Sequence, residues 1–148
     1  MTTIARNNKA KFDYELMQTY EAGLSLYGHE VKSIKTGNIS LKGAFVTMKG
    51  EELYLTNALI PLYKHAGNIK EYDPNRSRKL LVKKSEIRSI IGKKKQAGLT
   101  LVPIRVYTKG KFVKVEFALA RGKSKHDKRH SIKKRETDRS IARAFKRS

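Results

Sequence analysis

The sequence predicts a mainly β fold with α-helical insertions, arranged as a small closed or partly open antiparallel barrel. Several stretches alternate apolar and polar side chains with a period of two, which is typical of half-buried strands. Two pairs of such stretches are joined by short turns that contain glycine, as in β-hairpins. Two further stretches carry aliphatic residues three or four positions apart, which indicates helices between the strands, and we expect about three helices in all.

Five or six strands are expected. The first lies within residues 17–28, where apolar and polar or small side chains alternate. Residues 44–60 form two strand patterns around Gly50 and therefore a hairpin. The short apolar run at residues 79–83 adds a strand, and residues 99–120 form a second hairpin that turns at the TKGK sequence.

Helices are expected at two places between these strands. In HEVKSIKTGN, Val31 and Ile34 lie three residues apart, and Gly37 suits the position just after a helix. The second helix follows a long polar loop. Ser85 is its expected N-cap, before EIRSIIGKKKQAG, and Gly98 is expected to end it.

The net charge limits the classes of partner. The chain of 148 residues contains 34 Lys and Arg against 13 Asp and Glu, a formal net charge of +21. Such an imbalance favours a polyanionic partner, nucleic acid first and an anionic membrane surface second. There is no cysteine, which excludes disulfides and thiolate metal sites, and no apolar run reaches the roughly 18 residues of a membrane span. The N-terminus lacks the apolar centre of a secretory signal, so we expect a cytoplasmic protein.

The C-terminal end is a basic tail. Residues 121–148 contain 12 Lys or Arg and 3 acidic residues, and their only large apolar side chains are Ile132, Ile141 and Phe145. That is too little apolar surface to offset the entropy of ordering the segment alone. We therefore expect a folded domain at residues 1–120 and a tail that is disordered in solution. The composition leaves open whether the tail is an electrostatic anchor, a targeting signal or a segment that folds on a specific surface.

Cations and tyrosines of the folded domain are candidates for contact with RNA. Lysine and arginine neutralise phosphates, and exposed aromatic rings stack on unpaired bases. The candidates are Tyr14, Tyr27, Lys32, Lys35, Arg78 and Lys114. Any one of these cations also fits a merely solvated surface, and Tyr20, Tyr54 and Tyr107 are expected in the core. Glu21 is unusual on a strand of so basic a protein: it either accepts hydrogen bonds from base amino groups or pairs with a nearby lysine.

Catalysis and metal binding receive little support from the sequence. It contains no phosphate-binding GxxxxGK[ST] loop, no GxSxG and no HExxH. His126 and His130 are four residues apart, but their surroundings are cationic, so we expect no metal site and no cofactor. An RNA-processing nuclease and a constitutive ribosomal protein remain as alternatives to a non-catalytic RNA-binding protein. The tail lacks the broad apolar face of a membrane-surface helix.

Several motifs, in their order and spacing, resemble the SsrA-binding protein family (small protein B). The similarity runs from about residue 7 to residue 136. The motifs are YEAGLSLYGHEVKSIKTGNISLKGAFV, DPNRSRKLL, GLTLVPIRVY, VKVEFALARGKSKHDKR and IKKRE.

The resemblance implies an OB-like antiparallel barrel with helices and no enzymatic activity. Members of this family bind the tRNA-like domain of transfer-messenger RNA (tmRNA, or SsrA RNA). They deliver it to bacterial ribosomes stalled on broken messages, where the protein stands in for the anticodon stem that this RNA lacks. The family's tail is disordered in solution and becomes helical in the empty mRNA channel near the decoding centre, among ribosomal RNA. The implied partners are thus tmRNA and the ribosome, with no membrane and a monomeric chain.

The resemblance also implies roles for single positions. Glu21 lies in the family's EAG motif, Leu81 in RKLL and Lys114 in VKV, all of which the family uses to bind tmRNA. The implied ribosome-contacting tail residues are His126, Asp127, Lys128, Arg129, Ile132, Lys133, Arg135, Ile141 and Phe145. As a helix, the tail would carry Ile141 and Phe145 on one side. In one departure, KFDY places Phe12 where the family's RHxY motif has histidine, so stacking on RNA survives there but a histidine hydrogen bond does not.

Overall fold

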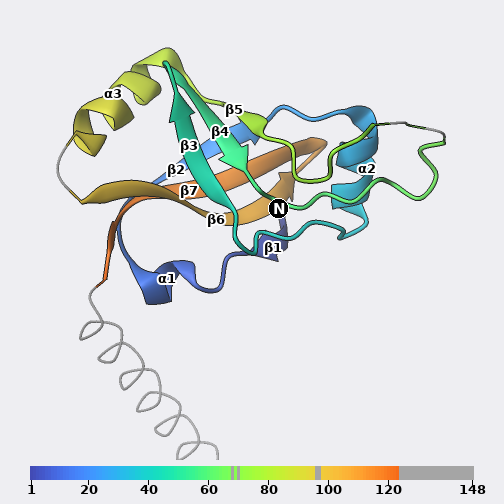
Figure 1. The fold of residues 1–148 in the computed structure, drawn as a ribbon, viewed down its shortest axis with the longest axis horizontal. Helices are drawn as coiled ribbons and strands as arrows, with labels where there is room; N and C mark the ends of the chain where they lie inside the picture. Colours follow the sequence, from blue (N-terminus) through green and yellow to red (C-terminus); the bar gives the residue numbers. More distant parts are fainter. Residues whose placement is uncertain (68, 70, 96–97, 124–148) are drawn as a thin grey trace, which may run out of the picture.

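Strands and helices alternate along the part of the chain that the computed structural model describes, namely residues 1–67, 69, 71–95 and 98–123. In chain order the elements are β1 (Thr2–Arg6), α1 (Ala10–Asp13), β2 (Tyr14–Leu24), α2 (Gly28–Lys35), β3 (Phe45–Lys49), β4 (Glu52–Thr56), β5 (Arg78–Leu81), α3 (Lys84–Lys94), β6 (Leu99–Lys109) and β7 (Phe112–Gly122). The expected mainly β class with helical insertions is confirmed (Figure 1).

The strands of this described part form one antiparallel sheet in the order β1-β6-β7-β2-β5-β4-β3. The sheet does not close, because β1 and β3 remain its two edges. It does curl, because one cavity is lined both by Ile4 and Arg6 of β1 and by Phe45 of β3. The molecule is therefore the partly open form of the expected OB-like barrel.

Two long strands from opposite ends of the chain build the core. β2 and β7 pair from Tyr14 opposite Gly122 to Gly23 opposite Lys114. Tyr20 and Phe117 face each other across this ladder, and their rings stack with centroids 5.5 Å apart. Because successive side chains of a strand point to opposite faces, Glu21 is left on the outer face of the sheet.

Helices α2 and α3 lie at opposite ends of the sheet and each contributes a fully buried isoleucine, Ile34 and Ile90 (Figure 1). Gly37 follows α2 with φ of 88°, as expected for a residue just after a helix. The expected N-cap of α3 is wrong. Lys83 occupies that position without a side-chain hydrogen bond, and Ser85 lies in the first turn. The helix starts earlier because it follows almost directly from β5.

The N-terminal elements were not expected from the sequence. Residues of β1 pair with β6, with Thr3 opposite Tyr107, and this raises the strand count above the five or six predicted. The segment TTIAR has a single large apolar residue, Ile4, so its pattern is too short to indicate a strand. Its backbone pairing with the long strand β6 holds this segment as a strand, although its own side chains include little apolar surface.

The last described strand passes beyond the expected domain boundary at residue 120. β7 continues to Gly122, and the backbone N–H of Lys123 donates to the carbonyl of Asp13 at 2.9 Å. The described chain thus ends next to α1.

Candidate nucleic-acid interface

A row of directly paired residues crosses four strands on the outside of the sheet, with Leu81 exposed at one end and Tyr107 buried at the other. Leu81 of β5 pairs with Gly23 of β2, Gly23 with Lys114 of β7, and Lys114 with Tyr107 of β6. Directly paired residues project from the same face of a sheet. We call these four residues the outer row. Glu21 lies two positions before Gly23 and so shares their face.

One end of the outer row combines exposed apolar side chains with cations. Leu81 is 55% exposed and Phe112, at the start of β7, is 59% exposed. The ammonium groups of Lys114 and Lys111 lie 5.7 and 5.9 Å from the centre of the Phe112 ring. A groove of about 320 Å³ runs between these side chains. Its chemistry suits a nucleotide, with apolar surface for a base or sugar and ammonium groups for a phosphate.

Gly23 makes this end of the row possible. A Cβ at Gly23 would lie 3.3 Å from the Cβ of Leu81, closer than ordinary van der Waals contact. The absence of a side chain lets Leu81 lie over β2 and keeps the groove open. The need for glycine here is set by the neighbouring strand, since the Gly23 backbone is ordinary β-strand.

Glu21 is held by a tyrosine. The Tyr107 hydroxyl donates a hydrogen bond to Glu21 Oε2, and this bond lowers the carboxyl pKa below its ordinary value, with further help from nearby cations that include Lys109 and Lys114. Burial, and then the bond to Glu21, raise the pKa of Tyr107. The Arg105 guanidinium covers the Tyr107 ring at 4.4 Å. No lysine ion pair to Glu21 is found among the described residues, although Lys109 and Lys114 are near enough to lower its pKa.

A second aromatic group lies at the start of α2. Tyr27 is 56% exposed, and the guanidinium of Arg76 lies over its ring, 4.0 Å from the ring centre. Arg76 is fixed in turn by Glu30, to which its Nε donates at 3.2 Å. One face of the Tyr27 ring is therefore occupied by a fixed cation, and such a pair offers both a stacking surface and a positive charge to RNA.

Glu30 and Arg78 form a fully buried ion pair that joins α2 to β5. Arg78 Nε and Nη2 donate to Glu30 Oε2 at 2.9 and 2.6 Å, and Arg78 Nη1 donates to the Ala58 carbonyl at 2.7 Å. Burial alone would raise the Glu30 pKa, but hydrogen bonds from Arg76, the Tyr27 backbone, Arg78 and Tyr72 lower it to about 2. The Tyr72 pKa is raised to about 12 by burial and by Glu30.

The expectation that Arg78 is a surface cation is wrong. Its side chain has no exposed area. Its guanidinium donates to Glu30, to the Tyr72 hydroxyl, and to the carbonyls of Ala58 and Pro74. The charge of Arg78 therefore neutralises Glu30 inside the protein, which is why a pattern of basic residues alone misplaced it. Arg76, two positions earlier, takes its place at the surface.

Three other candidates lie apart from the outer row. Lys32 and Lys35 are exposed in the last turn of α2, where cations also complement the helix dipole. Tyr14 is half-buried and packs on a small cluster with Ala10 and Val102, beside α1. Of the tyrosines expected in the core, Tyr20 and Tyr107 are buried and Tyr54 is half-buried.

The tail candidates lie outside the described residues. These are His126, Asp127, Lys128, Arg129, Ile132, Lys133, Arg135, Ile141 and Phe145.

Sequence reasoning missed Phe112 and Gly23. Phe112 follows the TKGK turn directly, and an aromatic residue between two lysines at a hairpin tip was the available signal. The close approach of Leu81 to Gly23 had no signal in the sequence, because it depends on pairing between β5 and β2.

Among the described residues, no group of three or more His, Cys, Asp or Glu is placed to hold a metal ion. No helix in the same part of the chain is long and apolar enough to cross a membrane.

Comparison with known proteins decides the family. A family model described as "SmpB protein" matches residues 4–147. The chain belongs to the SmpB family. Among curated members, it is 47% identical over 144 residues to the "SsrA-binding protein" of Acaryochloris marina, covering 97% of this chain and 94% of the relative. It is 49% identical over 143 residues to that of Halothermothrix orenii, covering 97% and 92%.

A solved structure shows the same SmpB-family fold. It is described as "tmRNA-SmpB: a journey to the center of the bacterial ribosome", and its matching chain is 42% identical, with a TM-score of 0.66. The match covers 86% of this chain and 92% of the other.

Proposed function

We propose that this chain is a non-catalytic RNA-binding protein that binds the tRNA-like domain of transfer-messenger RNA and delivers it to stalled bacterial ribosomes for trans-translation. The observation that carries the proposal is the identity of nearly one half with SsrA-binding proteins over 97% of the chain. The solved relative, whose description joins tmRNA, SmpB and the bacterial ribosome, supports the same partners.

The outer row supplies the proposed contacts with tmRNA. Lys114 and Lys111 contact phosphates, while Leu81 and Phe112 pack against a sugar or an unpaired base. Glu21, kept ionised by Tyr107, accepts hydrogen bonds from base amino groups. The support for this arrangement is that distant parts of the sequence meet on one exposed face with complementary chemistry.

A second set of proposed contacts lies around α2. Tyr27 with Arg76 offers a stacking surface, and Lys32 and Lys35 add positive charge one to two turns further along the helix. These residues provide a cationic and aromatic surface separate from the outer row.

The tail is proposed to act at the ribosome. The tail becomes helical in the empty mRNA channel, where its residues between His126 and Phe145 contact the ribosome and phosphates neutralise the charge that opposes folding in solution. A scramble of residues 124–148 at constant charge tests this. We expect the scrambled protein to bind tmRNA normally and to lose tagging of a stalled peptide in a reconstituted translation reaction. Full tagging by the scrambled protein would contradict this proposal and show that the tail acts only through its positive charge.

We further propose that the chain acts as a monomer in the cytoplasm and carries no catalytic step. Incubation of the protein with tmRNA and Mg²⁺ tests the last point, because intact RNA is expected and specific cleavage would favour a nuclease.

The central experiment compares a transcript of the tRNA-like domain with an unrelated hairpin of equal length. Binding is measured by fluorescence anisotropy at about 0.15 M salt. We expect Lys114→Glu to weaken binding to the tRNA-like domain, while Lys84→Glu, an equal charge reversal at an exposed site outside the outer row, has little effect. Equal binding to both RNAs, or equal effects of both variants, would show that net charge alone is responsible.

A further inference from the structure

The buried carboxylate of Glu30 is shared by two arginines. Arg78 is fully buried and donates to Glu30 Oε2 from Nε and Nη2, at 2.9 and 2.6 Å. Arg76 donates from Nε to Oε2 at 3.2 Å and from Nη2 to Oε1, and 25% of its side chain stays exposed. One buried carboxylate needs only one counter-charge, which Arg78 supplies. Arg76 is therefore a second, partly exposed cation that the buried pair does not need for neutrality.

The backbone of Arg76 is held in a tight turn. In the sequence DPNR, the Arg76 N–H donates to the carbonyl of Asp73 at 3.2 Å, and Pro74 occupies the second position, as in common β-turns. The Asn75 N–H also donates to Asp73 Oδ1 at 2.9 Å. The Pro74 carbonyl accepts a bond from the buried Arg78 at 3.0 Å. The turn and the ion pair thus fix both ends of the Arg76 side chain.

All three nitrogens of the Arg76 guanidinium donate hydrogen bonds within the protein. Nε and Nη2 donate to Glu30, and Nη1 donates to the carbonyl of Ser77 at 3.4 Å. An arginine binds phosphate most strongly through two parallel N–H bonds from one edge of its plane. No edge of Arg76 has two uncommitted nitrogens, so a ligand meets this side chain from the sides of its plane.

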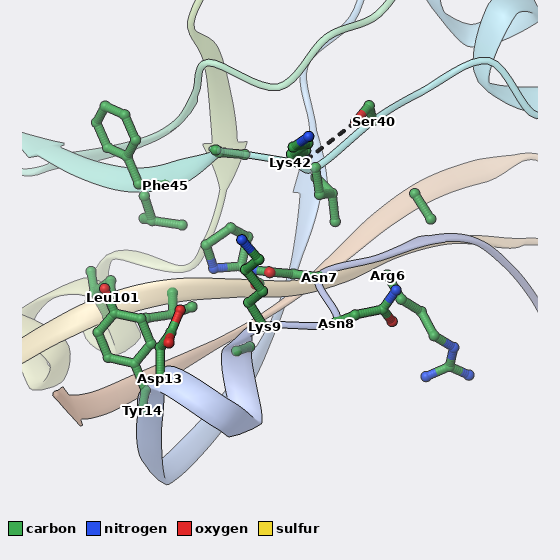
Figure 2. Close-up of a pocket in the computed structure, with 18 of the residues that line it drawn as sticks. Arg6, Asn7, Asn8, Lys9, Asp13, Tyr14, Ser40, Lys42, Phe45 and Leu101 are labelled. Carbon is green, nitrogen blue, oxygen red and sulfur yellow. Dashed lines mark hydrogen bonds between the residues drawn. The ribbon is translucent and has the colours of Figure 1, made fainter. Parts of the chain in front are cut away.

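Arg6 shows the opposite arrangement. Its side chain points outward beside the cavity that lies between β1 and β3 (Figure 2). Among the described residues, no ion pair involves its guanidinium. Such a cation can turn its N–H edge toward any anion in the solvent, whereas Arg76 cannot do so without leaving Glu30.

The Arg76 guanidinium lies over the ring of Tyr27 at the start of α2. Its central carbon is 4.0 Å from the ring centre, and Tyr27 remains 56% exposed. Glu30 Oε1 accepts a bond from Arg76 Nη2 and another from the Tyr27 backbone N–H, the latter at 2.8 Å. One carboxylate oxygen therefore holds the ring and the cation together. Aromatic rings and guanidinium planes both stack on unpaired bases.

We propose that Glu30 is a positioning residue that makes Arg76 part of a base-stacking surface instead of a phosphate-binding cation. The proposal rests on the RNA-binding function proposed above and adds what is recognised at the start of α2, namely an unpaired base packed against the Tyr27–Arg76 pair. Because every base has a π-face, this contact tolerates different sequences. Because no phosphate is neutralised, it increases affinity without increasing the salt dependence of binding.

The salt dependence of RNA binding separates stacking from phosphate contact. Dissociation constants of the full-length protein for the tRNA-like domain are measured by fluorescence anisotropy between about 0.05 and 0.3 M salt, and each lost phosphate contact lowers the slope of log K against log salt by about 0.7–0.9. We expect that loss for Lys114→Ala. Arg76→Ala should weaken binding about fivefold or more while the slope stays at the wild-type value. Arg88→Ala, which removes the same charge at an exposed site on α3, should change neither.

Glu30→Gln tests the positioning role itself. The variant keeps the shape of the side chain but no longer holds Arg76 by charge, so the freed guanidinium can bind a phosphate. We expect the slope to become steeper by about 0.7–0.9, and this change to vanish when Arg76→Ala is added. A merely structural role would lower the folded fraction, which circular dichroism measures, without making the slope steeper. If Glu30→Gln does not fold, the comparison of Arg76→Ala with Lys114→Ala still decides.

NMR spectroscopy of the unmodified protein gives a second measurement. When the tRNA-like domain is added, the ring protons of Tyr27 should move upfield, because a stacked base shields them. The Arg76 Nε–H should stay protected from exchange with solvent, because Glu30 keeps its hydrogen bond. Loss of that protection on binding would mean that the RNA replaces Glu30 as the partner of Arg76, and the proposal would then be wrong.

Three results of the salt titrations would also overturn the proposal. A lower slope for Arg76→Ala would make Arg76 a phosphate contact, and an unchanged affinity would place the pair outside the RNA interface. An unchanged slope for folded Glu30→Gln would leave Glu30 with a structural role only. Failure of the proposed function gives a different result, because the wild-type protein would then bind an unrelated hairpin as tightly as the tRNA-like domain.

Discussion

Glu30→Gln tests whether the buried ion pair holds α2 against β5. The substitution keeps the shape of the side chain but removes the charge that faces Arg78 and Arg76. Arg78 has no exposed area, so its guanidinium would remain in the interior without a counter-charge. Removing one partner of a buried pair typically costs about 3–5 kcal/mol, because the other charge stays desolvated.

The Glu30 pKa gives a second route to the magnitude. It falls from 4.5 to about 2 on folding. Each pKa unit corresponds to about 1.4 kcal/mol, so the ionised carboxylate contributes on the order of 3 kcal/mol at neutral pH. Both routes agree on a loss of about 3 kcal/mol for Glu30→Gln, a large part of the 5–15 kcal/mol typical of a folded domain. Since the folded pKa lies below the unfolded one, this contribution is complete above about pH 4.5 and is lost as pH falls toward 2.

Urea denaturation followed by circular dichroism provides the measurement. Wild type and Glu30→Gln are compared at pH 7 and again near pH 3, and the difference between them is expected to shrink at the lower pH. Glu52→Gln is the control, because it removes a half-exposed ion pair with Lys79, for which little or no change is expected. The reasoning is refuted if Glu30→Gln unfolds at the same urea concentration as Glu52→Gln, or if its deficit is as large at pH 3 as at pH 7.

Three further predictions concern the outer row. Phe112→Ala should weaken binding of the tRNA-like domain by about 1–3 kcal/mol in anisotropy titrations. Because the ring is 59% exposed, the free energy of unfolding should change by less than about 0.5 kcal/mol, and a large loss of stability would show that the ring packs against the protein instead. Gly23→Val should displace Leu81 and cost about 1–3 kcal/mol of stability by urea denaturation, with weaker RNA binding, and an unchanged stability would mean that Leu81 moves freely. Tyr107→Phe should raise the Glu21 pKa toward 4.5 in a ¹³C NMR titration, since the hydroxyl that stabilises the carboxylate is removed; an unchanged pKa would assign the lowering to the cations alone.

Local patterns in the sequence predicted much of the sheet. The hairpins β3–β4 and β6–β7 were anticipated because each needs only alternation and a nearby turn, which are properties of adjacent residues. The helices α2 and α3 were anticipated from the spacing of their aliphatic residues. β1 was missed because its pairing partner, β6, lies about a hundred residues away and its own pattern is short.

The role of a charged residue also depends on long-range contacts that the sequence does not show. Lys114 and Arg78 look equivalent as single letters in a basic chain, yet Lys114 stays beside Phe112 at the surface and Arg78 is buried against Glu30. Only the packing of α2 against β5 separates the two, because it places a buried carboxylate next to one of them.

By itself, the sequence determined the mainly β class, the basic tail, the preference for a polyanion and the resemblance to one family, since these depend on composition, short-range periodicity and local motifs. The tertiary structure alone decided which cations are free, which glycine is needed beneath Leu81, and that the barrel remains open between β1 and β3. These features arise between segments far apart in the chain. Burial, desolvation and register act on neighbours in space, and the sequence lists only neighbours along the chain.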